Sequence, residues 1–93
     1  MSDVAGPILE SPADALQRRI WLAVSQRFTE CQSGGLTQAD LGRALGAPRS
    51  QVNVWLKSPE RMTLKAAARL LAAMDAEVLV AVRTREETMR SAS

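Results

Sequence analysis

Apolar residues recur at steps of three and four along the first third of the chain, which predicts one long amphipathic helix. Its apolar stripe comprises Leu16, Ile20, Ala23, Val24, Phe28 and Cys31. Ser11 can cap the start of this helix, with Pro12 in the first helical position and Asp14 placed to complete a capping box. The pair Gly34 and Gly35 then ends it.

Three shorter helices are expected to follow. The second begins after a capping Thr37 and ends at Gly46, and the third covers about residues 48–55. Pro59 interrupts the pattern before a fourth helix over about residues 64–74. The fourth helix is apolar over most of its surface, so we expect it to be largely buried.

The pattern changes again at residues 77–85, where an apolar run rich in β-branched side chains favours a strand. The centre of this run is Val78, Leu79, Val80, Ala81 and Val82. No other segment of the sequence has the pattern of a strand, so its backbone groups would find no partner within one chain. We therefore predict that the run pairs with its own copy in a second chain, as a two-stranded antiparallel ribbon of a homodimer. The alternative is that the fourth helix continues through residues 77–84.

The length of 93 residues suits a single domain with a thin core, which a partner subunit would help to stabilise. The chain lacks histidine and has one cysteine, Cys31, which excludes an internal disulfide and argues against a zinc site or a histidine-based catalytic triad. We therefore expect no enzyme activity, no metal and no cofactor. No apolar run approaches the roughly 20 residues of a membrane span, and the N-terminus lacks the features of a signal peptide, so a cytoplasmic location is expected.

The net charge of +2 says little, but the distribution of charge is uneven. Residues 38–69 contain two acids, Asp40 and Glu60, against six bases. The bases are Arg43, Arg49, Lys57, Arg61, Lys65 and Arg69. Such a local basic surface suits a polyanion, although a solvated face with scattered charges would give the same count.

Residues 38–57 combine two short helices with a tight turn, and their small and apolar residues have distinct physical roles. Gly46 lies where the turn needs a positive φ, and Gly42 lies one helical turn earlier, where the helices approach too closely for a large side chain. The apolar residues between the two helices are Leu41, Leu45, Val52 and Trp55. This arrangement leaves the polar residues of the second helix on its outer face.

The outer face of that second helix carries hydrogen-bonding groups that suit base edges. Its residues are Arg49, Ser50, Gln51, Asn53 and Val54. Arginine can form two hydrogen bonds with guanine, glutamine and asparagine can do the same with adenine, and Val54 can touch a thymine methyl group. A helix that binds another protein would instead offer aromatic or methionine anchors.

The spacing of these residues resembles the Cro/repressor-type (XRE-like) helix-turn-helix family over roughly residues 12–75. The matching residues are Leu36, Thr37, Gln38, Leu41, Gly42, Leu45, Gly46, Val52, Trp55 and Leu56. The resemblance implies that the second helix of the motif enters the major groove of double-stranded DNA, where the outer-face residues read bases. Phosphate contacts are expected from Gln38, Arg43, Lys57, Arg61 and Lys65. Pro48 departs from the serine, threonine or asparagine cap that is common in the family, and Gly42 stands where alanine is common.

The end of the chain carries a second resemblance. Met62-Thr63-Leu64, Leu70-Leu71 and residues 74–82 are similar to HipB-type antitoxins, in which a fourth helix leads into a strand that pairs across the dimer. We thus expect an all-α, four-helix Cro/repressor-like domain with a short C-terminal β-strand. The expected function is a homodimeric transcriptional regulator, a repressor at the nucleoid, on an inverted-repeat operator. Two alternatives stay open: an antitoxin that also binds a toxin and regulates its own expression, and a protein-interaction module that does not bind DNA.

These predictions divide the chain into four parts. Residues 1–10 are a flexible N-terminal arm, residues 11–76 the helix-turn-helix DNA-binding domain, residues 77–85 the dimerisation strand and residues 86–93 a disordered tail. The arm has no clear hydrophobic period, and the tail is polar and terminal.

Overall fold

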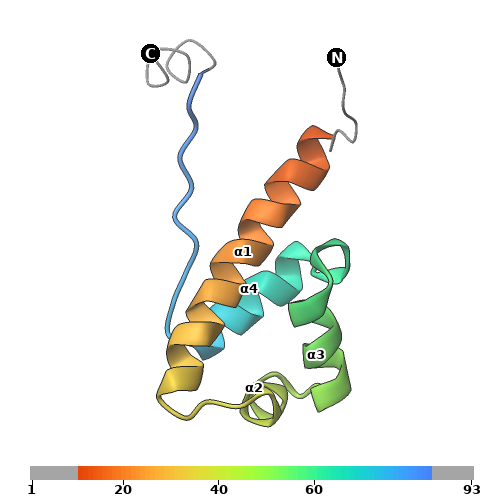
Figure 1. Ribbon diagram of the computed structural model, residues 1–93, viewed down its shortest axis with the longest axis vertical. Helices are drawn as coiled ribbons and strands as arrows, with labels where there is room; N and C mark the ends of the chain where they lie inside the picture. Colours follow the sequence, from red (N-terminus) through yellow and green to blue (C-terminus); the bar gives the residue numbers. More distant parts are fainter. Residues whose placement is uncertain (1–10, 85–93) are drawn as a thin grey trace.

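The computed structural model describes residues 11–84, which fold into α-helices joined by short connections (Figure 1). The elements in chain order are α1 (Pro12–Ser33), α2 (Gln38–Leu45), α3 (Arg49–Lys57), the 3-10 turn η1 (Pro59–Arg61) and α4 (Leu64–Ala73). The four predicted helices are confirmed, and the described part of the chain is a small all-helical domain. The predicted arm, residues 1–10, and the predicted tail, residues 86–93, lie outside the described residues.

The helices start where their capping residues predict. At α2 a full capping box forms: the Asp40 amide donates to the Thr37 hydroxyl over 3.1 Å, and the Thr37 amide donates to the Asp40 carboxylate over 2.9 Å. This second bond is the main reason why the pKa of the Asp40 carboxyl lies below its usual value. At α1 the structure shows one of the two bonds, from the Asp14 amide to the Ser11 hydroxyl.

The core forms where α1 meets the shorter helices. α4 packs against both α1 and α2, and α2 packs against α3. The buried apolar residues are Val24, Phe28, Leu41, Leu45, Val52, Met62, Ala66, Ala67, Leu70, Leu71 and Met74. Removing their apolar surface from water is the main favourable contribution to folding.

Two sequence-based predictions of burial are too broad. Leu16 and Ala23 belong to the predicted stripe of α1, but both are exposed, Leu16 at 59%. α4 buries one face rather than most of its surface, and its Leu64 is 72% exposed. Both differences have the same reason, which is that the described elements of one chain do not cover these parts of α1 and α4.

The chain turns sharply after α4. Asp75 has a left-handed φ of 56°, and the Ala76 amide donates to the Leu71 carbonyl over 2.8 Å. Residues 77–84 then run as an extended segment back along α1 (Figure 1). The alternative in which the fourth helix continues through residues 77–84 is therefore wrong, because the left-handed turn ends the helix. Within residues 11–84 no strand forms, so pairing with a second chain stays a prediction.

Candidate nucleic-acid interface

α2 and α3 are joined by the tight turn 46–48. Gly46 has a φ of 68°, which residues other than glycine rarely adopt, and its amide donates to the Arg43 carbonyl over 3.4 Å. The Ala47 amide donates to the Gly42 carbonyl over 2.9 Å. The predicted need for glycine at position 46 is confirmed, and the two helices with this turn (residues 38–57) are called the α2–α3 unit.

Gly42 marks the closest approach of α2 to the turn. A Cβ atom at this position would lie 2.6 Å from the Ala47 carbonyl oxygen and 3.5 Å from the Arg49 amide nitrogen. The first distance is shorter than real Cβ contacts, and the carbonyl belongs to the backbone, so a side chain here would force the turn to move. The prediction that no large side chain fits at Gly42 is confirmed.

Replacing Gly42 with alanine is expected to destabilise the fold by about 1–3 kcal/mol, the usual cost of overpacking a tight contact. This sign is opposite to helix propensity, which favours alanine over glycine by about 1 kcal/mol. The free energy of unfolding is measured by urea titration with circular dichroism. Gly34→Ala is the matched control, because a Cβ there would lie at an ordinary 3.5 Å from the Cys31 carbonyl oxygen. Equal stabilities of the two variants would contradict the close approach at Gly42.

Side chains of α1 and α4 form hydrogen bonds with the backbone of the α2–α3 unit. The Trp21 indole N–H of α1 donates to the Trp55 carbonyl of α3 over 3.2 Å. The Arg69 guanidinium of α4 donates to the Leu45 carbonyl at the end of α2. Arg69, counted with the basic surface from sequence, is therefore occupied by a structural contact. Together these bonds fix the end of each helix in the unit.

Two further side chains of α1 bond backbone carbonyls of later elements. The Gln17 side-chain amide donates to the Pro59 and Met62 carbonyls over 2.9 and 3.0 Å. The Arg27 guanidinium donates twice to the Met74 carbonyl, over 3.0 and 2.7 Å. α1 is therefore the element to which α3, η1 and the end of α4 are fastened.

The residues predicted to read bases all lie on α3, and all are accessible to a ligand. Arg49 and Ser50 are exposed, whereas Gln51, Asn53 and Val54 are half-buried. Within the part of the chain that the structure describes, no hydrogen bond or ion pair occupies the polar side chains of this set. Their donor and acceptor groups are therefore free to bind a partner outside the chain.

The residues predicted to contact phosphate lie on the α2–α3 unit or on elements that pack against it. They are Gln38 and Arg43 on α2, Lys57 on α3, Arg61 on η1 and Lys65 on α4. Gln38 is half-buried, and the four basic residues are exposed. Arg43 forms an ion pair with Asp40, so part of its charge is already balanced.

A polar depression of about 430 Å³ lies where α1 ends and where α2 and α3 begin. Its lining residues are Gln32, Gly35, Leu36, Thr37, Gln38 and Arg49. The depression brings the predicted phosphate residue Gln38 close to the predicted base-reading residue Arg49. Gln32 was missed from sequence, because the turn at Gly34 and Gly35 folds the end of α1 back to α2, and no spacing of residues predicts this return.

The chain matches no model of a known protein family, and comparison with the curated proteins and with the solved structures gives no match either. In the described part of the chain, no helix is both long and apolar enough to span a membrane. Residues 11–84 also contain no group of three or more histidine, cysteine, aspartate or glutamate side chains that could hold a metal ion. The chemistry of the α2–α3 unit is therefore the guide to function.

Proposed function

We propose that this protein is a sequence-specific DNA-binding transcriptional regulator that acts as a homodimer, with the α2–α3 unit as a helix-turn-helix of the Cro/repressor type. The observation that carries the proposal is the outer face of α3. There, arginine, serine, glutamine and asparagine side chains are accessible and have no partner among the described residues. These side chains form no hydrogen bond within the described residues that would stabilise the fold, but they match the donors and acceptors of base edges.

α3 enters the major groove of the duplex in this proposal, with its first residues turned toward the bases. Arg49 suits the two acceptors of guanine, and Gln51 and Asn53 suit the donor and acceptor of adenine. Ser50 can bond either kind of base, and Val54 can contact the methyl group of thymine. The hydrogen bonds from Trp21 and Arg69 to the backbone of the α2–α3 unit would hold α3 in one orientation while it makes these contacts.

Contacts to the phosphate backbone set the register of the protein on DNA without reading its sequence. Gln38 stands at the start of α2, beside Arg49 in the polar depression, where a phosphate oxygen can accept hydrogen bonds. The exposed basic side chains of Lys57, Arg61 and Lys65 add an electrostatic attraction to the phosphates, which salt weakens. Arg43 contributes less, because Asp40 balances its charge.

A homodimer places two α3 helices in successive major grooves on one face of the duplex, roughly 34 Å apart. The operator is then an inverted repeat, and the dimer represses by excluding polymerase from the promoter, in the cytoplasm at the nucleoid. We assign dimerisation to residues 77–85, with 78–82 at the centre of a β-ribbon. The support is that the backbone of residues 78–83 makes no hydrogen bond within the described residues.

The direct test is selection of bound sequences from a random duplex pool, with purified protein at about physiological salt. Enrichment of an inverted repeat supports a dimeric regulator and supplies its operator. The absence of any enriched sequence would overturn the proposed sequence-specific DNA binding.

Arg49→Ala is expected to weaken binding to the selected operator by about 1–3 kcal/mol and to relax the preference at one base pair in each half-site. Lys57→Ala is expected to weaken binding to all sequences alike and to lower the salt slope by about one. Arg19→Ala is the charge-matched control, because Arg19 is an exposed residue on α1 outside the α2–α3 unit. Affinity is measured by fluorescence anisotropy at several salt concentrations. An Arg49→Ala protein with unchanged affinity and base preference would contradict the assignment of the reading face.

A protein-interaction function is the second candidate, and it includes the case of an antitoxin that also binds a toxin. The observation that favours it is the exposed apolar segment after α4, where Leu79 is 95% and Val82 is 91% exposed. Contiguous exposed apolar residues mark surfaces that bind other proteins. A chain that enriches no DNA sequence but forms a stable complex through this segment would support this candidate.

A further inference from the structure

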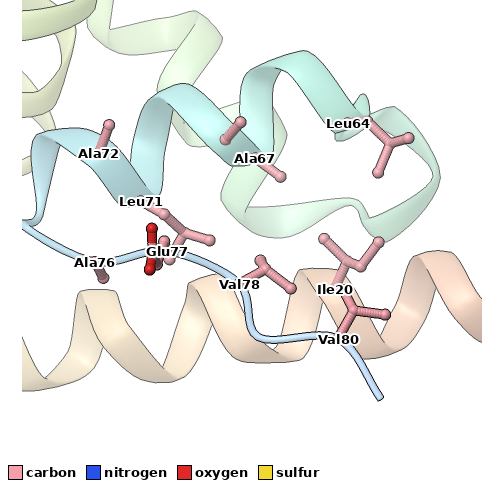
Figure 2. Close-up of a pocket in the computed structure, with 10 residues that line it drawn as sticks. Ile20, Leu64, Ala67, Leu71, Ala72, Ala76, Glu77, Val78 and Val80 are labelled. Carbon is pink, nitrogen blue, oxygen red and sulfur yellow. The ribbon is translucent and has the colours of Figure 1, made fainter. Parts of the chain in front are cut away.

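An apolar groove of about 470 Å³ runs between α1, α4 and the extended segment after α4 (Figure 2). Its helical walls are Ile20 of α1 and Leu64, Ala67, Ala68, Leu71 and Ala72 of α4. Figure 2 shows Val78 and Val80 of the extended segment beside Ile20. The groove is open to solvent on its remaining side, because in the described residues one extended segment is its only cover.

Side chains of the extended segment alternate between two faces, as in a β-strand. Ala76, Glu77, Val78 and Val80 line the groove. Val78 is 42% and Val80 is 76% exposed, whereas Leu79 between them is 95% exposed. Val82 continues the groove face by the same alternation, yet it is 91% exposed. The described part of one chain therefore leaves Val82 exposed to solvent, on the face of the segment that carries the groove-lining residues Val78 and Val80.

We propose that a second copy of this chain closes the groove, through antiparallel pairing of residues 77–83 about a two-fold axis at Val80. The inference rests on the homodimer of the proposed function and adds its register and its contacts. In this register Val80 faces the partner's Val80, and Val78 lies opposite the partner's Val82. Opposite residues of an antiparallel pair point to the same face, so the partner's Val82 lies over the groove beside Val78.

Charge complementarity selects this register. Glu77 lies opposite the partner's Arg83, and the two-fold symmetry produces this pair at both ends of the ribbon. An axis at Leu79 would place Glu77 opposite the partner's Ala81. An axis at Ala81 would place Glu77 opposite the partner's Arg85, but it would leave Arg83 opposite the partner's Leu79. The axis at Val80 alone pairs Glu77 with Arg83, and it alone leaves neither of these charges opposite an apolar residue.

The register is tested by cysteine cross-linking in a Cys31→Ser background, without DNA. Val80→Cys is expected to form a covalent dimer in high yield, because opposite Cβ atoms lie about 4.5–5.5 Å apart, close to disulfide distance. Leu79→Cys is the control for random collision, since Leu79 is the more exposed residue. In this register the two Leu79 positions are diagonal, about 7–8 Å apart, so its yield falls by about fivefold or more. A mixture of Leu79→Cys and Ala81→Cys chains is expected to cross-link again.

A charge exchange tests the same register without cysteines. Glu77→Arg is expected to raise the dimer dissociation constant by about tenfold at low salt, because two ion pairs become two repulsions. Glu77→Arg combined with Arg83→Glu is expected to restore the dissociation constant to within about twofold of the original. Both values come from sedimentation equilibrium.

Higher yield from Leu79→Cys than from Val80→Cys, or a double charge variant that dimerises no better than the single one, would overturn the register. A chain that sediments as a monomer and still enriches a DNA sequence would overturn the inference and leave DNA binding standing. A Val80→Cys dimer in a protein that enriches no DNA sequence would support the inference and remove the DNA-binding function. These outcomes therefore distinguish a failure of the dimer ribbon from a failure of DNA binding.

Discussion

Replacing Leu70 with alanine is expected to remove about 3–5 kcal/mol from the free energy of unfolding, the range found when fully buried leucines are truncated. Leu70 has no exposed surface and lies on the face of α4 that packs into the core. A domain of this size has a total stability of only about 5–10 kcal/mol or less, so the variant should be largely unfolded near body temperature. Urea unfolding followed by circular dichroism gives the value, at one fixed protein concentration, because the proposed dimerisation would add to the apparent stability.

Leu22→Ala is the matched control for this experiment. Leu22 is also a helical leucine, but it is 44% exposed, and it lines neither the core nor the apolar groove. Its loss is expected to cost less than about 1 kcal/mol. If Leu70→Ala and Leu22→Ala unfolded at the same urea concentration, the placement of α4 against α1 and α2 would be wrong.

Replacing Val80 with proline is expected to raise the dimer dissociation constant by about 100-fold or more, since each of two symmetry-related prolines costs about 1.4 kcal/mol or more. Proline has no amide hydrogen and holds φ near about −65°, which disturbs an extended, paired strand. Sedimentation equilibrium measures the change. Under the proposed function, DNA affinity should fall with it, because a monomer would contact one half-site only.

Val80→Ala separates the loss of the backbone donor from the loss of apolar surface. Alanine keeps the amide hydrogen, so this variant is expected to dimerise more tightly than Val80→Pro by about tenfold. Circular dichroism should show the helices of both variants intact, because position 80 lies beyond α4. A Val80→Pro protein that still sediments as a dimer would exclude a ribbon in which the Val80 amide donates a hydrogen bond to the partner strand.

Short-range features of the fold could be predicted from sequence because they act between close neighbours. The capping box needs only Thr37 and Asp40, three residues apart. The left-handed turn needs only a glycine at position 46. The placement of accessible polar residues on α3 followed from the same local periodicity, because Val52 fixes which side of the helix faces the core.

Contacts between distant segments could not be predicted in this way. Nothing in the spacing of residues indicated that Arg69 would bond the Leu45 carbonyl, or that Gln32 would line the depression at Arg49. The hydrophobic pattern also placed Leu16 in the core stripe, whereas it is 59% exposed. Such a pattern shows which side chains are better removed from water, but it does not show which chain covers them.

The hydrogen bonds that Trp21, Gln17 and Arg69 donate to other elements share one chemical property. In each of them the acceptor is a backbone carbonyl. Trp21 bonds the carbonyl of residue 55, Gln17 those of residues 59 and 62, and Arg69 that of residue 45. A carbonyl is present whatever side chain its residue carries. The residues on the outer face of α3 can therefore be exchanged without breaking any of these bonds. Under the proposed function, copies of this chain could thus diverge in the DNA sequence they bind while they keep one scaffold.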